Sequence, residues 1–479
     1  MKGSFARLLA ALLGTGAAAV LMSATPAAAA TAHYTGTLAD GATWIADVPS
    51  TWNGTLLLYS HGFGPLTAAD APDPVTQGAL LADGYALAGS SYDPNGSWWA
   101  LGSAVRDQFQ TLMSVEKSVL PTTPKEVYAV GTSMGGLISA LEDQNANGRI
   151  NGALTTCGIV AGALNLNQYQ LDGEWALNEL LAAGTAKLTG FTVGPPTFAD
   201  SGAAAAQLSA AASAAQAAPQ GRARLALAMA FLNVSDWGGA TIPNIYDYAG
   251  QEQGQYQQFF LPLGTFPLSG EFFIETARQQ LEAAAGGDSA GTVGVDFARL
   301  LYQSSYYPEV RALYNEAGLD LETDLRTLDQ SANIRPNPGA YRWLAQTSVP
   351  SGVLQVPELD LHTISDQLVP VQQERYYEQT VRRAGYSALL RQAFVQAQGH
   401  CNFTPAELVA GVQALATRVT GGNWGTLTTA ASLNAAANAM PPTLGGGSFI
   451  PFWPERLTAA IEPLEPFTSP LTGPLWQGS

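Results

Sequence analysis

The segment Gly131-Thr132-Ser133-Met134-Gly135 constrains the fold of this chain more than any other. Residues 126–131 read as a short apolar strand, and residues 134–144 as a helix. A serine on a sharp turn from strand to helix projects its hydroxyl above the edge of the sheet, and glycines on both sides remove side chains that would clash there. The pattern G-x-S-x-G in this context predicts that Ser133 is a nucleophile.

A second segment, Gly287-Asp288-Ser289-Ala290-Gly291, fits the same pattern in a different context. It follows a helical stretch, residues 281–285, and Gly286-Gly287 resembles the cap that ends a helix. Because no strand leads into this segment, we do not expect Ser289 to be a nucleophile.

The regions around Ser133 and near the C-terminus alternate between strands and helices, which is typical of a parallel sheet with helices on both faces. The sequence therefore predicts an α/β fold with a mostly parallel central sheet. The expected strands are residues 32–38, 43–48, 55–60, 85–92, 126–131, 152–157, 353–361 and 389–395. The expected helices of this part are residues 103–120, 134–144, 371–383 and 404–420.

The alternation stops in the middle of the chain, where Ala-rich and aromatic helical stretches follow one another. We expect a helical insertion over residues 159–349, here called the cap, with helices at 203–218, 222–231, 272–285 and 297–313. The core is then built from residues 31–158 and 350–420. Residues 421–479, rich in Gly and Pro, are expected to wrap the surface.

The N-terminus is typical of a secretory signal peptide, predicted over residues 1–30. Lys2 and Arg7 form a positive start, residues 8–21 are apolar, and small residues lead to a cleavage point near Ala30 or Ala32. The apolar run is shorter than a membrane span requires. We therefore expect a secreted, extracellular protein without a membrane span.

Charge and composition exclude several classes of partner and cofactor. The formal net charge is −17, which argues against nucleic acid as a partner. The chain has only 4 His and 2 Cys, and it lacks the H-E-x-x-H pattern and an early Gly-rich nucleotide motif. We expect neither a metal ion nor another cofactor.

A serine hydroxyl needs a neighbouring imidazole to accept its proton. His400 lies in a loop between the expected strand 389–395 and the helix 404–420, where α/β sheets present their functional groups. His33 lies beside the cleavage point, and His61 precedes Ser133. His362 is expected to shape the loop that holds Asp366. We predict His400 as the general base.

The imidazole in turn needs a carboxylate that fixes its tautomer. Asp366 follows the expected strand 353–361 and directly precedes a helix. Asp360 and Glu358 are alternatives, but they lie within that strand. The positional argument favours Asp366.

The order Ser133, Asp366, His400, with a large insertion after the strand that follows the nucleophile helix, resembles the α/β-hydrolase superfamily of serine hydrolases. Ser60-His61-Gly62-Phe63-Gly64 resembles the H-G-x-G oxyanion turn of that family. The resemblance implies an α/β-hydrolase fold and cleavage of carboxylic esters, in small molecules or polymers, through an acyl-enzyme. It also implies an oxyanion hole from the backbone N–H groups of Met134 and Phe63, with Gly62 as the alternative to Phe63.

Cys157 and Cys401 are the two cysteines, and an even count in a secreted chain favours a disulfide over two free thiols. His400-Cys401 resembles half of a linkage found in tannases and feruloyl esterases. That family has a cysteine directly before the nucleophile, whereas this chain has Thr132. The substrate of that family is therefore not assigned to this chain.

Features that bear on the substrate leave alternatives open. Trp98 and Trp99 lie on a loop that either lines a pocket or packs under the cap. A secreted exopeptidase of the same fold is the second hypothesis, and it requires an acidic cap residue that binds an amine; Glu252, Glu271 and Glu275 are the candidates. The third hypothesis is a binding protein without catalytic activity.

Overall fold

The computed structural model describes residues 30–191, 198–260 and 269–460. The predicted signal peptide therefore lies almost wholly outside the described residues. One sheet of nine strands runs through the core, in the order β1-β2-β4-β3-β5-β6-β7-β8-β9. Its strands are β1 Thr31–Thr37, β2 Thr43–Pro49, β3 Thr55–Ser60, β4 Ala86–Ser90, β5 Glu126–Thr132, β6 Gly152–Thr156, β7 Glu358–Ser365, β8 Leu390–Gln398 and β9 Phe449–Ile450.

The strands from β4 to β8 pair in parallel, and the antiparallel pairs lie at the two edges of the sheet. Side chains of a strand alternate between the two faces. In β3, Leu56 and Leu58 pack into one hydrophobic cluster, whereas Leu57 and Tyr59 pack into another. Both faces of the sheet are therefore covered, as expected for a parallel sheet.

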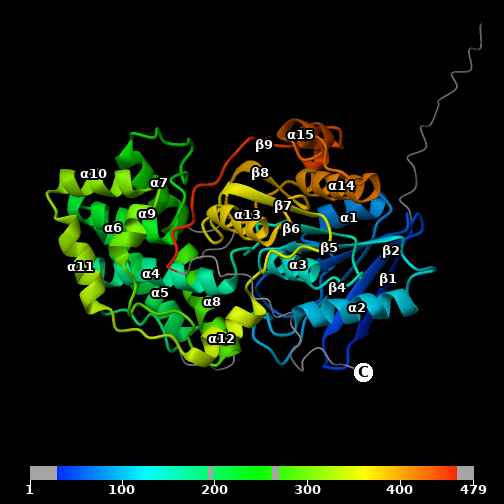
Figure 1. Ribbon diagram of the computed structural model, residues 1–479, viewed down its shortest axis with the longest axis horizontal. Coiled ribbons are helices and arrows are strands. Elements are labelled where there is room, and N and C mark those ends of the chain that lie inside the picture. Colours follow the sequence, from blue (N-terminus) through cyan, green and yellow to red (C-terminus); the bar gives the residue numbers. More distant parts are fainter. Residues whose placement is uncertain (1–29, 192–197, 261–268, 461–479) are drawn as a thin grey trace, which may run out of the picture.

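Helices of the core form a layer on each face of the sheet (Figure 1). One layer contains α1, α14 and α15, which contribute to the cluster with Leu57, and the other contains α2 and α3. The core helices are α1 Pro74–Ala82, α2 Ala104–Ser118, α3 Met134–Gln144, α13 Gln372–Ala384, α14 Pro405–Gly421 and α15 Ala430–Asn438. This arrangement confirms the predicted fold class, a mostly parallel sheet flanked by helices.

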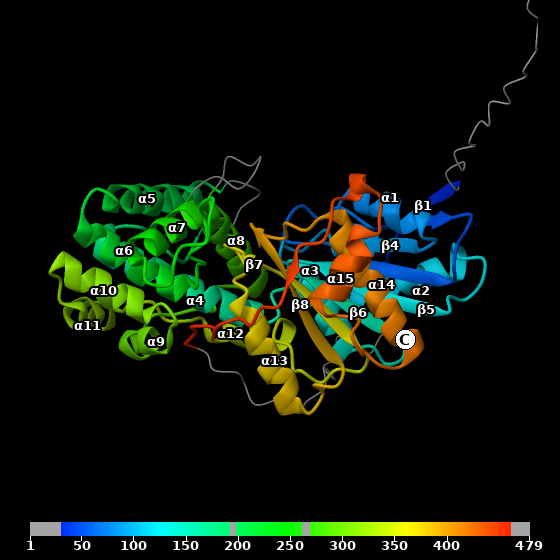
Figure 2. The same cartoon turned by 90° about the horizontal axis from the view of Figure 1, so that it is seen from above.

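The helices between β6 and β7 gather into a lobe beside the sheet, as Figures 1 and 2 both show. They are α4 Ala163–Leu181, α5 Ala199–Ala215, α6 Pro219–Leu232, α7 Tyr248–Phe260, α8 Gly270–Ala285, α9 Phe297–Gln303, α10 Tyr307–Ala317, α11 Leu321–Ser331 and α12 Pro338–Thr347. The backbone N–H of Ala163 donates to the carbonyl of Ser348 at 3.3 Å, so the two ends of this excursion meet. The described part of the chain contains no helix that is both long and apolar enough to cross a bilayer.

Three local expectations differ from the structure. The strand expected at 353–361 is observed later, as β7, because Pro357 cannot donate a ladder hydrogen bond and immediately precedes it. The helix expected at 297–313 is two helices, α9 and α10, with a break before Pro308 in the first turn of α10. Within the described part of the C-terminal segment, β9 pairs with β8, which was not expected, and residues 461–479 of the expected tail lie outside the described residues.

Candidate active site

Ser133 lies at the turn from β5 to α3, in a strained conformation with φ of 60° and ψ of −121°. The turn leaves no room for side chains on either side: a Cβ on Gly131 would collide with the carbonyl of Gly135, and one on Gly135 with that of Ser60. The N–H of Ser133 donates to the carbonyl of Thr156 at 2.9 Å, which ties the turn to the end of β6. Gly131 and Gly135 thus permit a tight turn in which Ser133 adopts a backbone conformation that is rare for residues other than glycine.

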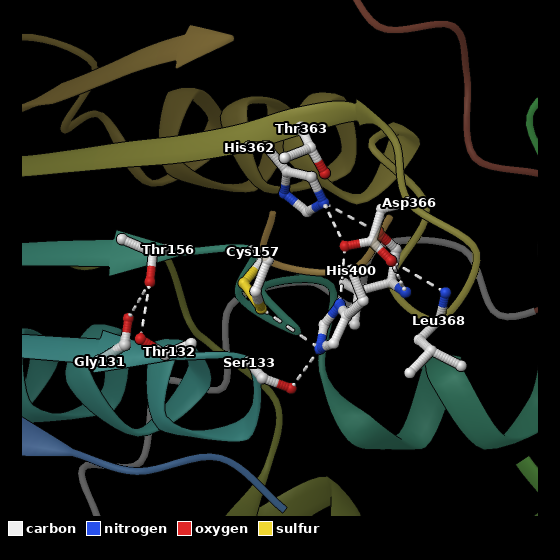
Figure 3. Close-up of a disulfide and its surroundings, with 12 residues drawn as sticks. Gly131, Thr132, Ser133, Thr156, Cys157, His362, Thr363, Asp366, Leu368 and His400 are labelled. Carbon is white, nitrogen blue, oxygen red and sulfur yellow. Dashed lines mark hydrogen bonds and ion pairs between the residues drawn. A yellow bond between two sulfur atoms is a disulfide. The ribbon is translucent and has the colours of Figure 1, made fainter. Parts of the chain in front are cut away.

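Ser133, His400 and Asp366 form a continuous chain of hydrogen bonds (Figure 3). The Nε2 atom of His400 lies 2.8 Å from Oγ of Ser133, and its Nδ1 atom lies 2.7 Å from Oδ2 of Asp366. The three side chains follow the carboxyl ends of β5, β7 and β8, which meet at one edge of the sheet. Residues 267 positions apart in the sequence are thereby brought into contact.

The turn of residues 366–369, here called the acid turn, orients the carboxylate of Asp366. Its Oδ1 atom accepts the backbone N–H groups of Leu368 and Val369, both at 2.9 Å, which leaves Oδ2 for His400. Burial of this side chain by itself would raise the pKa of Asp366, but His400 and the N–H of Val369 hold that pKa below its usual value. The arrangement therefore favours an ionised carboxylate beside His400.

A disulfide joins Cys157 to Cys401, with a Cα–Cα distance of 5.3 Å (Figure 3). Cys157 follows β6 and Cys401 follows His400, so the bond ties the His400 loop to the neighbouring strand. The Sγ atom of Cys401 lies 3.3 Å from Nε2 of His400. At the position before Ser133, the hydroxyl of Thr132 instead pairs with that of Thr156 at 2.9 Å. The cysteine that bonds to Cys401 therefore follows β6, the neighbour of β5, instead of directly preceding Ser133.

The turn at residues 61–63 lies directly against the serine. A Cβ on Gly62 would stand 3.3 Å from Cβ of Ser133 and 3.7 Å from its Oγ. The His61 ring stacks on Tyr92 with centroids 4.2 Å apart, and its Nδ1 atom lies 2.8 Å from the carbonyl of Gly62. Since that carbonyl can only accept, Nδ1 carries the proton, which fixes the orientation of the peptide group between Gly62 and Phe63.

Four aromatic side chains connect the core to the cap: Phe63, Trp98, Trp99 and Phe198. Phe63 contacts both tryptophans, with centroids 5.7 Å and 5.3 Å apart, and Trp98 contacts Phe198 at 5.4 Å. Trp99 is 4% exposed, and its indole N–H donates to the carbonyl of Ala277 in α8 at 2.8 Å. Trp99 therefore packs under the cap, whereas pocket lining by Trp98 stays a prediction.

The cap also contacts the residues that flank Asp366 and His400. The hydroxyl of Ser365 donates to the carbonyl of Trp237 at 2.7 Å, and the amide of Gln258 donates to the carbonyl of Ser365 at 2.8 Å. Near His400, the amide of Gln398 donates to the carbonyl of Gly239 at 2.5 Å. Sequence reasoning missed these contacts, because a glutamine or a carbonyl in the cap carries no local pattern that identifies its partner.

The alternative residues lie elsewhere or have other partners. His33 pairs with Asp47 at 2.8 Å and is largely exposed. Asp360 is buried within β7 and accepts the hydroxyl of Thr155 at 2.6 Å, while Glu358 is buried on the same strand. Ser289 is buried in the loop after α8, where its hydroxyl accepts the amide of Asn167 at 3.0 Å.

Two groups of side chains in the described ranges have the spacing of metal ligands. In the first group, Cys157 and Cys401 are joined in the disulfide beside His400 and so offer no thiolate. The second, Glu174, Glu271 and Glu275, is buried in the cap, where Arg278 pairs with Glu174. Burial foremost raises the pKa of Glu271 and of Glu275, which favours neutral carboxyl groups.

The acidic residues considered for amine binding are enclosed within the cap. Glu252, Glu271 and Glu275 are all fully buried. Glu252 accepts the guanidinium of Arg222 at 2.5 Å, so its charge is already compensated. As they stand in the structure, none of the three offers an exposed carboxylate to a substrate.

No family model matches the sequence. The chain is similar to o-phthalyl amidase of Xanthobacter agilis, with 27% identity over 424 residues that cover 84% of this chain and 90% of that protein. Among solved structures it is similar to feruloyl esterase B from Aspergillus oryzae, with 13% identity, coverage of 82% and 80%, and a TM-score of 0.39. It is also similar to brefeldin A esterase, a bacterial homologue of human hormone-sensitive lipase, with 13% identity, coverage of 86% and 76%, and a TM-score of 0.37.

The fold itself rests on the strand order and the turn at Ser133. A parallel sheet in which the turn at Ser133 joins a central strand to a helix, with Asp366 and His400 after later strands, has the architecture that the resemblance implied. The chain has the α/β-hydrolase fold.

Proposed function

We propose that this chain is a secreted serine hydrolase that cleaves carboxylic esters through an acyl-enzyme on Ser133. The observation that carries the proposal is the hydrogen-bonded chain from Ser133 through His400 to Asp366. Nucleophilic catalysis requires three groups: a hydroxyl, an imidazole that accepts its proton, and a carboxylate that holds the imidazole in one tautomer and orientation. Ser133, His400 and Asp366 supply them in that order.

In the proposed mechanism, His400 accepts the proton of Ser133 while Oγ attacks the ester carbonyl. Asp366 holds the Nδ1 proton and stabilises the imidazolium that forms. The imidazolium then gives its proton to the leaving alcohol, and the acyl group remains on Ser133. Water, deprotonated by His400, then attacks the acyl-enzyme. The imidazolium returns the proton to Oγ of Ser133 as the bond between the acyl group and Oγ breaks and the acid leaves.

The backbone N–H groups of Met134 and Phe63 are proposed to bind the oxyanion of both tetrahedral states. The proximity of Gly62 to the serine and the fixed peptide group before Phe63 support this assignment. Met134 begins α3, so the positive end of the helix dipole lies at the same place. Removing one such donor commonly costs about 3 kcal/mol of the barrier stabilisation.

A fluorophosphonate probe tests the nucleophile without knowledge of the substrate. We expect the probe to label Ser133, identified by mass spectrometry of the labelled peptide. A chain that remains unlabelled, or that is labelled at another serine, would refute the proposal, and the first of these results would favour the non-catalytic alternative.

Amide cleavage is the second candidate activity, and the similarity to an amidase favours it. The same acyl-enzyme chemistry applies to amides, with an amine as the leaving group. Comparing the hydrolysis rates of a nitrophenyl ester, an aryl amide and an aminoacyl anilide separates the possibilities. We expect the ester to react fastest; preference for the aminoacyl anilide would instead support the exopeptidase alternative.

Export is part of the proposal and rests on the N-terminal sequence together with the disulfide. Disulfides persist in oxidising compartments and are rare in the cytosol of most organisms. Mass measurement of the protein from the culture medium should show an N-terminus near Ala30 or Ala32. It should also show no thiol that reacts with a maleimide.

A further inference from the structure

His362 lies behind the proposed acid and contacts the turn that holds it. It is part of β7, four residues before Asp366, and its side chain is fully buried. The Nε2 atom lies 2.8 Å from the carbonyl of Val369, and the Nδ1 atom lies 2.8 Å from Oε1 of Glu374. Figure 3 shows the ring beside Asp366, whose Oδ2 atom lies 3.7 Å from Nε2.

The hydrogen-bond partners of His362 determine how many protons it shares with Glu374. The carbonyl of Val369 can only accept, so Nε2 of His362 must carry a hydrogen. The hydrogen bond between Nδ1 of His362 and Oε1 of Glu374 then contains one proton, which lies either on the ring or on the carboxyl group. In both cases the charges of His362 and Glu374 sum to zero, because an imidazolium faces a carboxylate or a neutral ring faces a neutral acid.

The surroundings of Glu374 favour the neutral acid. Its side chain is fully buried in α13, and its second oxygen accepts the amide of Gln392 at 2.6 Å. Burial raises the pKa of Glu374 to about 8, although hydrogen bonding with Asp360 and Gln392 acts in the opposite direction. Burial, before any effect of nearby carboxylates, also lowers the pKa of His362, which favours the uncharged ring.

The hydrogen bond to Val369 gives this pair a link to the site. Val369 donates its N–H to Oδ1 of Asp366 and accepts from His362 through its carbonyl. The two backbone polar groups of Val369 therefore connect the carboxylate of Asp366 to the pair of His362 and Glu374. A shift of the acid turn would move Asp366 relative to His400.

We propose that His362 and Glu374 form a buried pair that shares one proton and holds the acid turn in place, so that His362 is a positioning residue for Asp366. The inference rests on the proposed function, because it assigns His362 a role only through the carboxylate that orients His400. Neither side chain touches Ser133, and neither is a catalytic residue.

The rate of labelling of Ser133 by a fluorophosphonate measures activation of the nucleophile and needs no identified substrate. We expect His362→Phe, which keeps the ring but removes both hydrogen bonds, to lower this rate about 100-fold, since small misplacements of a catalytic group have effects of this size. Circular dichroism and the unfolding midpoint establish that the variant is folded. Ser289→Ala is the matched control, because it removes a buried hydrogen bond with Asn167 inside the cap without contacting the acid turn or Glu374.

A double-mutant cycle separates positioning from a general structural role. If His362 acts through Asp366, then His362→Phe should slow labelling by less than about threefold in an Asp366→Asn background. The same loss in both backgrounds would overturn the inference, as would a wild-type rate in the single variant.

A second test compares two substitutions at Glu374, of which Glu374→Gln keeps the size and shape of the side chain. The amide of Glu374→Gln can donate to Nδ1 of His362 and accept from Gln392, as the neutral acid does, whereas Glu374→Ala leaves Nδ1 without a partner. We expect the glutamine variant to recover most of the rate that the alanine variant loses. Equal rates for the two variants would contradict the shared proton. Failure of the wild-type chain to label at Ser133 would instead contradict the proposed function.

Discussion

Two segments of this chain fit G-x-S-x-G, and the structure gives them different environments. Ser133 lies between a strand and a helix, with positive φ and with its hydroxyl 2.8 Å from an imidazole. Ser289 lies after a helix, and its hydroxyl accepts an amide hydrogen from Asn167 inside the cap. The glycines of the pattern therefore supply only conformational freedom. The preceding secondary structure, a strand before Ser133 and a helix before Ser289, determines whether the hydroxyl lies at the edge of the sheet or is buried.

The largest expected difference is in activity. Ser133→Ala should lower the turnover number by about 10⁴- to 10⁶-fold, because the remaining groups cannot form an acyl-enzyme. Ser289→Ala should retain the wild-type turnover number. Steady-state kinetics on one nitrophenyl ester measures both variants, and a comparable loss in the two would remove the distinction between the segments.

The disulfide reinforces only the first of the two segments. Replacing Cys157 and Cys401 with serine should lower the free energy of unfolding by at most about 5 kcal/mol, because the bond closes a loop with a sequence separation of 244. The turnover number should fall as well, since the His400 loop loses its link to β6. Urea titration and kinetics on the same preparation test both effects. An unchanged turnover number would show that the surrounding contacts alone hold His400.

The two segments should respond to pH in opposite directions. Near Ser289, Gln168 bonds to both Gly291 and Asp172, and burial raises the pKa of Asp172 to about 8 despite hydrogen bonding from Gln168 and the charge of Arg278. A raised pKa stabilises the folded chain at low pH, and this contribution is lost as the pH rises from about 4 to 8. Asp172→Asn should therefore flatten the decline in unfolding free energy over this window, by up to about 1.4 kcal/mol per pH unit.

Near Ser133 the sign is reversed, since the pKa of Asp366 is lowered in the folded chain. Its contribution to stability is present above about pH 4 and is lost as the pH falls through the folded value. Asp366→Asn should reduce the destabilisation at acid pH and leave the decline above pH 4 unchanged. Urea titrations between pH 3 and about pH 9 measure both variants. Equal slopes in wild type and both variants would contradict the assignment.

The smallest expected effect is on stability at the second serine. Ser289→Ala removes one buried hydrogen bond from Asn167, which should cost about 1 kcal/mol of unfolding free energy. The unfolding midpoint in urea reports this cost. A change near zero would indicate that Asn167 relies on its other acceptor, Asp288, at 2.8 Å.

The sequence predicted much of the core because its local signals agree with its tertiary contacts. The strand and helix around Ser133 were expected within one residue of their observed ends. Asp366 and His400 were chosen because each follows a strand, and the structure brings them together. The hydrogen bonds between them depend on pairing across the sheet, which no local pattern encodes.

The cap was harder to predict because its helices bury polar residues. Helix α4 encloses Asn165, Asn167, Asp172 and Glu174 along with its apolar residues, so it lacks the polar face that identifies a surface helix. No individual helix is therefore predicted at these residues, although they lie within the expected helical insertion 159–349. The role of His362 depends on Glu374, a residue of the next helix, whose contact with the ring could not be inferred from spacing alone.

The hydrogen bond between Ala163 and Ser348 has a consequence for how this protein can be modified. A lobe whose first and last residues are neighbours can be exchanged for another, or replaced by a short turn, without moving the strands that precede Ser133, Asp366 and His400. Such an exchange would have to supply new acceptors for Ser365 and Gln398. Kinetics on such exchanged chains would measure what the lobe contributes to substrate preference, separately from the chemistry proposed at Ser133.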